Sequence, residues 1–116
     1  MENCIFCKIA RGDIPSRKIY EDDEALAFHD IRPLAPVHFM VIPKIHISSL
    51  AELTEDHQPL MGKLMVLASK LAREQGCTNG FRTIINTGTV GGQEVHHLHI
   101  HIVGGSEPLG PMLARR

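Results

Sequence analysis

The chain has 116 residues and a formal net charge of −1, with 22% charged and 43% hydrophobic residues. This length suits a single domain over residues 1–116, and the balanced charge gives no sign of a nucleic-acid or membrane partner. No apolar run of 18 residues occurs, and the first residues lack the pattern of a signal peptide. The three cysteines, an odd number, argue against a disulfide framework, so we expect a cytoplasmic protein.

The first half of the chain predicts a short helix and three strands. Residues 4–11 can form a helical turn, which the run from Gly12 to Ser16 ends. Strands at 18–21 and 25–29 are expected to form a hairpin around an acidic turn. A loop with two prolines follows at 32–36, and the next strand is expected at 37–42.

A long helix is predicted in the middle of the chain. Thr54 stands where an N-cap is expected, and Pro59 must then lie in the first turn. Apolar residues recur at three- and four-residue steps from Leu60 to Ala72, and Gly76 ends the helix. With strands at 81–87 and 95–103, these elements predict an α+β fold, one long helix and a short N-terminal helix on an antiparallel sheet of about five strands.

The last predicted strand carries His97, His99 and His101, which alternate with aliphatic residues. Alternate residues of a strand share a face, so the three imidazoles are expected on one exposed face or cleft, with Leu98 and Ile100 toward the core. The alternation excludes a purification tag. The residues alone leave three interpretations: a solvated face without a role, a zinc site, or a site that uses imidazole chemistry near neutral pH.

A glycine-rich loop precedes these histidines. Gly88, Gly91 and Gly92 let the backbone approach an anion closely, and Asn86 adds a polar donor just before the loop. Exposed N–H groups beside imidazoles favour a phosphate ligand over a plain structural metal.

Residues 97–103, His-Leu-His-Ile-His-Ile-Val, resemble the His-x-His-x-His-x-x signature of the histidine triad superfamily. The likeness extends over essentially the whole chain and is greatest to the branch of histidine triad nucleotide-binding proteins. The segments that carry it are residues 5–9, 14–15, 20–23, 27–31, 35–38, 41–44, 91–93 and 104–105, and residues 108–114 resemble the ending of bacterial members.

The resemblance implies a hydrolase of purine nucleoside 5'-phosphoramidates, conjugates of AMP or GMP with an amine, and of some acyl adenylates. His99 would be the nucleophile and would carry a transient nucleotidyl group. His101 would contact the phosphoryl oxygens and assist the leaving group, and His97 would support the orientation and tautomer of His99. His38 matches a fourth histidine behind the triad; its alternative is a core histidine bonded to a backbone carbonyl.

The resemblance also implies a nucleotide pocket. Asp30 would bind the ribose hydroxyls, while Asn86 and the backbone of Gly92 and Glu94 would hold the phosphate region. The Glu94 side chain is expected to face away, and His96 to lie opposite the triad. The walls of the base pocket would be Ile31, Phe28, His29, Phe6 and Ile9; for Phe6, Ile9 and Phe28 a plain core role is nearly as strong an alternative.

Some relatives bind zinc through residues that match Cys4, Cys7, His46 and His97, whereas many close relatives lack the cysteines. No cofactor would be required for catalysis, and zinc would be structural. Relatives are homodimers whose sheets join across the interface, with the C-terminal segment of one subunit near the other's active site. Residues 109–113 would then influence substrate choice.

Other functions remain open. The domain can be a purine nucleotide sensor in which hydrolysis is incidental, or a metalloprotein whose triad chelates zinc. Dinucleotide hydrolysis, as in the sister branch, is disfavoured because a glutamine is typical there at the position of Glu94 and the chains are longer.

Overall fold

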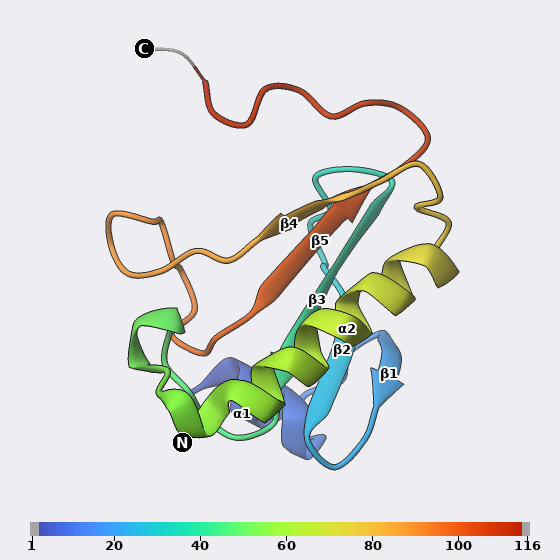
Figure 1. Ribbon diagram of the computed structural model, residues 1–116. Coiled ribbons are helices and arrows are strands. Elements are labelled where there is room, and N and C mark those ends of the chain that lie inside the picture. Colours follow the sequence, from blue (N-terminus) through green and yellow to red (C-terminus); the bar gives the residue numbers. More distant parts are fainter. Residues whose placement is uncertain (1–2, 115–116) are drawn as a thin grey trace.

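Five antiparallel strands form one sheet in the order β1-β2-β3-β5-β4, as the computed structural model of residues 3–114 shows (Figure 1). The α+β prediction is confirmed. Within these residues, no helix has the length and apolar character needed to cross a membrane. The elements are α1 (Ile5–Arg11), β1 (Lys18–Glu21), β2 (Ala25–His29), β3 (Val37–Pro43), 3₁₀ turns at Leu50–Glu52 and Glu55–His57, α2 (Gln58–Glu74), β4 (Arg82–Ile84) and β5 (Ile100–Gly104).

The two helices cover opposite faces of the sheet, because alternate strand residues point to opposite sides. On the α2 face, an apolar cluster joins Leu64, Leu67, Ala68 and Leu71 to strand residues Ala25, Ala27, Phe39, Val41, Ile100 and Ile102. On the other face, a second cluster joins Phe6 and Ile9 of α1 to Leu26, Phe28, Met40 and Ile42. Met40 pairs directly with His101, so this histidine lies on the α1 face.

Local signals place the ends of both helices as predicted. The Cys4 side chain caps α1 by accepting a hydrogen bond from the Cys7 N–H, and Gly12 ends the helix with φ of 85°. Thr54 precedes a 3₁₀ turn that leads into α2, and Pro59 lies in the first turn of α2. Gly76, with φ of 100°, follows the end of α2.

Two strand predictions were wrong in extent. The last strand is Ile100–Gly104, not 95–103, and β4 is Arg82–Ile84, not 81–87. The backbone before Ile100 is satisfied outside the sheet: the Leu98 N–H donates to the Ile47 carbonyl at 2.7 Å. Since β5 is the strand that pairs with β4, the late start of β5 leaves residues 86–87 with no strand opposite them.

Candidate active site

The ring of His99 has a defined tautomer. Its Nδ1 lies 2.7 Å from the backbone carbonyl oxygen of His97. A carbonyl oxygen only accepts, so Nδ1 carries the proton and Nε2 keeps its lone pair. Phe6 packs edge-on against the His99 ring, with centroids 5.1 Å apart. The neutral ring therefore presents the lone pair of Nε2, the form that a nucleophile requires.

The His97 side chain lies in the protein interior with 0% exposure, and His99 is buried as well with 6%, so the expectation of three imidazoles on one exposed face was wrong for these two residues. The segment 97–99 packs against the loop after β3 and does not continue the sheet. The His97 Nε2–H donates to the Pro43 carbonyl at 2.8 Å, which satisfies the buried ring and leaves the lone pair on Nδ1. Burial lowers the pKa of His97, and the Pro43 bond opposes this shift.

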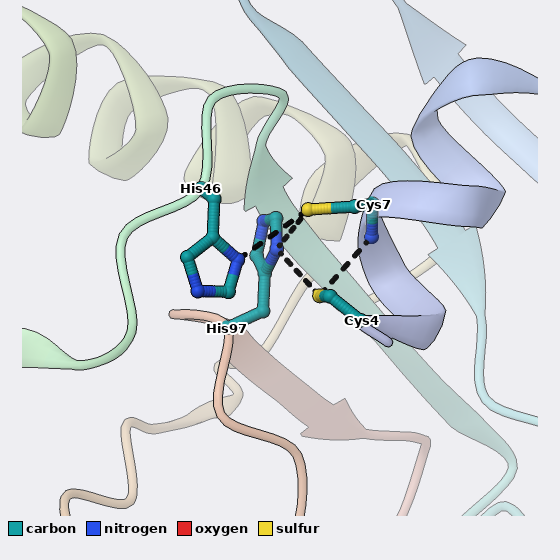
Figure 2. A group of neighbouring side chains, drawn as sticks. All are labelled: Cys4, Cys7, His46 and His97. Carbon is teal, nitrogen blue, oxygen red and sulfur yellow. Dashed lines mark hydrogen bonds between the residues drawn. The ribbon is translucent and has the colours of Figure 1, made fainter. Parts of the chain in front are cut away.

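The Nδ1 atom of His97 faces a cluster of two cysteines and a second histidine (Figure 2). It lies 3.3 Å from Cys4 Sγ and 3.5 Å from Cys7 Sγ, and Cys7 Sγ lies 3.4 Å from His46 Nδ1. Tetrahedral zinc, with its usual bond lengths, holds nitrogen and sulfur ligands about 3.5 Å apart. Burial raises the pKa of the Cys7 thiol, and the adjacent Cys4 adds to the rise. The donor set and spacing fit a closed Cys2His2 metal site.

His38 and His101 form a second pair on the α1 face of the sheet. His38 Nε2 lies 2.9 Å from His101 Nδ1 and 3.4 Å from Asp30 Oδ2. The Leu34 N–H donates to His38 Nδ1 at 3.1 Å. Burial lowers the pKa of His38, and it lowers that of His101 to about 4 with help from the neighbouring His99 and His38 rings. Both rings are therefore neutral at pH 7.

Asp30, His38 and His101 have donor atoms close enough for a cation. However, the Leu34 N–H occupies the lone pair of His38 Nδ1, so His38 Nε2 carries a proton and cannot ligate a metal. Of the two clusters, the hydrogen bonds therefore favour metal binding at the one formed by Cys4, Cys7, His46 and His97, and not at the one formed by Asp30, His38 and His101.

The expected base-pocket residues divide into two groups. Phe6, Ile9 and Phe28 are buried in the core beneath α1, and Phe6 stacks edge-on against Phe28. All three therefore lie in the core, and their expected role as walls of the base pocket stays a prediction; Phe6 also contacts the His99 ring. Ile31 is 90% exposed, and His29 is half-buried at the end of β2.

The glycine-rich loop is organised by Gln93, a buried residue whose role the sequence did not reveal. Its Oε1 accepts from the Gly88 N–H at 2.9 Å. Its Nε2 donates to the carbonyls of Ser48 and Val95 at 2.7 and 3.0 Å. One side chain therefore ties the loop to the segment before His97 and to the chain after His46.

The residues expected around the phosphate only partly have free groups that could bind it. The Gly92 N–H, expected to bind phosphate, donates to the Thr89 carbonyl at 3.1 Å and is engaged within the loop. Asn86 is half-buried just before the loop. Glu94 is exposed and borders a hollow of about 430 Å³ beside Cys4 and His46, and His96 is exposed as well.

Comparisons with known proteins agree with this architecture. A family model described as the scavenger mRNA decapping enzyme C-terminal binding domain matches residues 3–112. Protein HitA of Neisseria gonorrhoeae is 56% identical over 104 residues, which cover 90% of this chain and 97% of that protein. A purine nucleoside phosphoramidase of Escherichia coli K12 is 45% identical, over 99% of this chain and 97% of that protein.

Solved structures give the same result. A histidine triad protein from Clostridium difficile superimposes with a TM-score of 0.90 at 46% identity, over 96% of this chain and 97% of that one. A HIT family hydrolase from Legionella pneumophila also has a TM-score of 0.90, at 44% identity over 94% and 98% of the two chains. Sequence, fold and histidine cluster agree: the chain belongs to the histidine triad family.

Proposed function

We propose that the protein is a purine nucleoside phosphoramidase, a hydrolase that cleaves the P–N bond between a nucleoside 5'-phosphate and an amine. The proposal is supported by the 45% identity to the phosphoramidase of Escherichia coli and by the state of the His99 ring. Acyl adenylates, which present the same phosphorus with a different leaving group, form a second substrate class.

The observation that carries the proposal is the bond from His99 Nδ1 to the His97 carbonyl. It directs the lone pair of His99 to Nε2 and strengthens as the ring gains positive charge, because a carbonyl dipole stabilises a cationic donor. His101 lies beside it, with ring centroids 4.9 Å apart.

The reaction then proceeds in two displacements. His99 Nε2 attacks the α-phosphorus, the P–N bond breaks, and the amine takes up a proton from solvent as it leaves. Water attacks the same phosphorus, the bond between His99 and phosphorus breaks, and the water proton returns to solvent. No net proton is consumed, and His99 regains its starting tautomer. Asp30, with Asn86 and the glycine-rich loop, would hold the ribose and phosphate.

The test is AMP release from adenosine 5'-phosphoramidate by wild type and by His99→Ala. We expect release by wild type and no release above background by His99→Ala. Release by His96→Ala should be close to that of wild type, because His96 is an exposed histidine outside the triad. Mass spectrometry of wild type denatured at alkaline pH, where a bond between phosphorus and an imidazole nitrogen survives, should show an added nucleotidyl group. Nucleotide binding with equal, negligible release by wild type and His99→Ala would reject the enzyme and favour a sensor.

A structural zinc ion at Cys4, Cys7, His46 and His97 is part of the proposal. The fit rests on the lone pair of His97 Nδ1 and on donor separations of 3.3 to 3.5 Å. When bound, zinc would cross-link α1 to the segments that carry His46 and His97, and it would take no part in the chemical steps.

We also propose a homodimer whose sheets join through β4. Among residues 3–114, β5 is the strand that pairs with β4, so the other edge of β4 is open to a second copy. Val66 of α2 is 72% exposed, an apolar surface that a partner would cover. Light scattering should give twice the chain mass of 12.9 kDa; a monomer mass would contradict the dimer.

A further inference from the structure

We infer that the backbone N–H of Leu34 sets the tautomer of His101 through His38, and thereby makes His101 a neutral hydrogen-bond donor to the phosphoryl group. The inference rests on the proposed function for its chemical meaning. The tautomer itself is a property of the free protein and can be measured without a substrate.

The first step is the bond from the Leu34 N–H to His38 Nδ1, 3.1 Å long. A peptide N–H can only donate, so His38 Nδ1 must present its lone pair. A neutral imidazole has one protonated nitrogen, which for His38 is therefore Nε2. The ring is buried, so solvent does not offer an alternative partner.

The second step derives the tautomer of His101 from that of His38. The His38 Nε2–H donates to His101 Nδ1 at 2.9 Å, and Asp30 Oδ2 lies 3.4 Å from the same nitrogen as a second acceptor. His101 Nδ1 is therefore an acceptor, and the ring proton of His101 lies on Nε2. This Nε2–H is the group that His101 can offer to a ligand.

The same bonds disfavour the charged forms of both rings. A proton on His38 Nδ1 would face the Leu34 N–H, and a proton on His101 Nδ1 would face the His38 Nε2–H. The surroundings of His101 also disfavour its cation. Burial lowers the pKa of His101, the His99 and His38 rings lower it further, and the Asp30 carboxylate raises it by a smaller amount.

A neutral His101 acts differently from a general acid. It donates Nε2–H to a phosphoryl oxygen, where negative charge grows in the transition state, and keeps its proton throughout. Neutral imidazole is used as a donor in this manner where its environment suppresses the cation. The leaving amine then takes its proton from solvent. His101 would thus contact the phosphoryl oxygens, as the resemblance implies, but it would not supply a proton to the leaving group.

The position of Leu34 supports a role for its main chain. Its side chain is 79% exposed although it is apolar, so packing does not explain its placement. The surrounding loop is closed by two bonds: the Asp30 N–H donates to the His38 carbonyl at 3.0 Å, and the Arg32 N–H to Asp30 Oδ1 at 2.8 Å. These bonds hold the Leu34 N–H against the His38 ring.

The test is a two-bond ¹H–¹⁵N spectrum of the full chain labelled with ¹⁵N-histidine, without substrate, with ring signals assigned by His101→Asn and His38→Asn. We expect His38 and His101 both as Nε2–H tautomers at about pH 7. Replacing the Leu34 peptide N–H by an ester oxygen should let both rings sample the Nδ1–H form. Leu34→Ala keeps the N–H and should keep the wild-type tautomers.

An Nδ1–H, averaged or cationic His101 in the wild type would overturn the inference, and so would unchanged tautomers in the ester variant. The wild-type spectrum decides even when the ester variant does not fold. In the turnover assay, the ester should lower kcat roughly tenfold or more, with a smaller change in KM. A wild type with the expected tautomers and no turnover would reject the proposed function alone.

Discussion

The His99 ring is bonded to the backbone carbonyl of His97, with 2.7 Å between His99 Nδ1 and the oxygen. The His97 side chain, in turn, belongs to the Cys4–Cys7–His46 cluster and is anchored by Pro43. One residue therefore contributes its main chain to the candidate nucleophile and its side chain to a candidate metal site. Displacement of His97 would reach His99 directly, because the His97 carbonyl is the hydrogen-bond partner of the His99 ring.

Cys7→Ala should abolish stoichiometric zinc binding, because it removes a thiolate from a four-ligand site. Zinc per chain, measured by elemental analysis, should fall from about one to near zero. Cys77→Ala is the matched control, since Cys77 is buried but lies outside the cluster, and it should keep its zinc. A chelator should lower the Tm of wild type and leave that of Cys7→Ala unchanged; equal zinc contents in both variants would contradict the site.

Stability should fall as the pH is lowered from about 6.5 to about 4. The pKa of His101 is lowered to about 4 in the folded protein, whereas an unfolded histidine titrates near 6.5. In this window the unfolded state binds more protons, so acid favours unfolding, with a slope of up to about 1.4 kcal/mol per pH unit for one histidine. Urea unfolding at a series of pH values should show a shallower dependence for His101→Asn. A slope identical to wild type would contradict the prediction.

Gln93→Leu should destabilise the protein by about 2–4 kcal/mol, because it leaves buried backbone groups without partners. The bonds lost are those to the Gly88 N–H and to the carbonyls of Ser48 and Val95. Phosphoramidate turnover should fall as well, since the glycine-rich loop loses the hydrogen bond between the Gly88 N–H and Gln93. Gln58→Leu makes the same chemical change at an exposed position and should stay within about 0.5 kcal/mol of wild type in urea unfolding. Similar stabilities for the two variants would refute a special role for Gln93.

Two glycine-to-alanine substitutions should have contrasting effects: Gly91→Ala should lower turnover, whereas Gly62→Ala should raise stability. A Cβ at Gly91 would clash with the Thr87 carbonyl oxygen, which belongs to the backbone and cannot move aside alone, so the loop must deform and turnover should drop. Gly62 lies in α2 with open space where a Cβ would stand, and alanine there should raise stability by about 0.5–1 kcal/mol. Thermal unfolding and turnover separate the two effects; an active, stable Gly91→Ala would show that the loop tolerates displacement.

Much of the fold could be predicted because its signals are local. The cap at Thr54, the apolar stripe of α2 and the stop at Gly76 all act within a few residues, and the structure confirms them. The run His97–His101 likewise indicates the family from the sequence alone, since its alternating histidines form a specific local motif.

Only the tertiary structure decided where the site's hydrogen bonds go. The strand pattern around His99 continues back to Val95, yet those residues lie outside the sheet, where the Leu98 N–H bonds to the Ile47 carbonyl and the Val95 carbonyl accepts from Gln93. The Leu34 N–H is invisible in the sequence, since every residue except proline has one. The sequence therefore determined which imidazoles are present and in what order, whereas the folded backbone decided which nitrogen of each carries the proton. The bonds from His97 to Pro43 and from His38 to His101 join residues far apart in the chain. The bonds from His99 to the His97 carbonyl and from the Leu34 N–H to His38 join neighbours, but they form only in the local backbone conformation that the tertiary fold imposes.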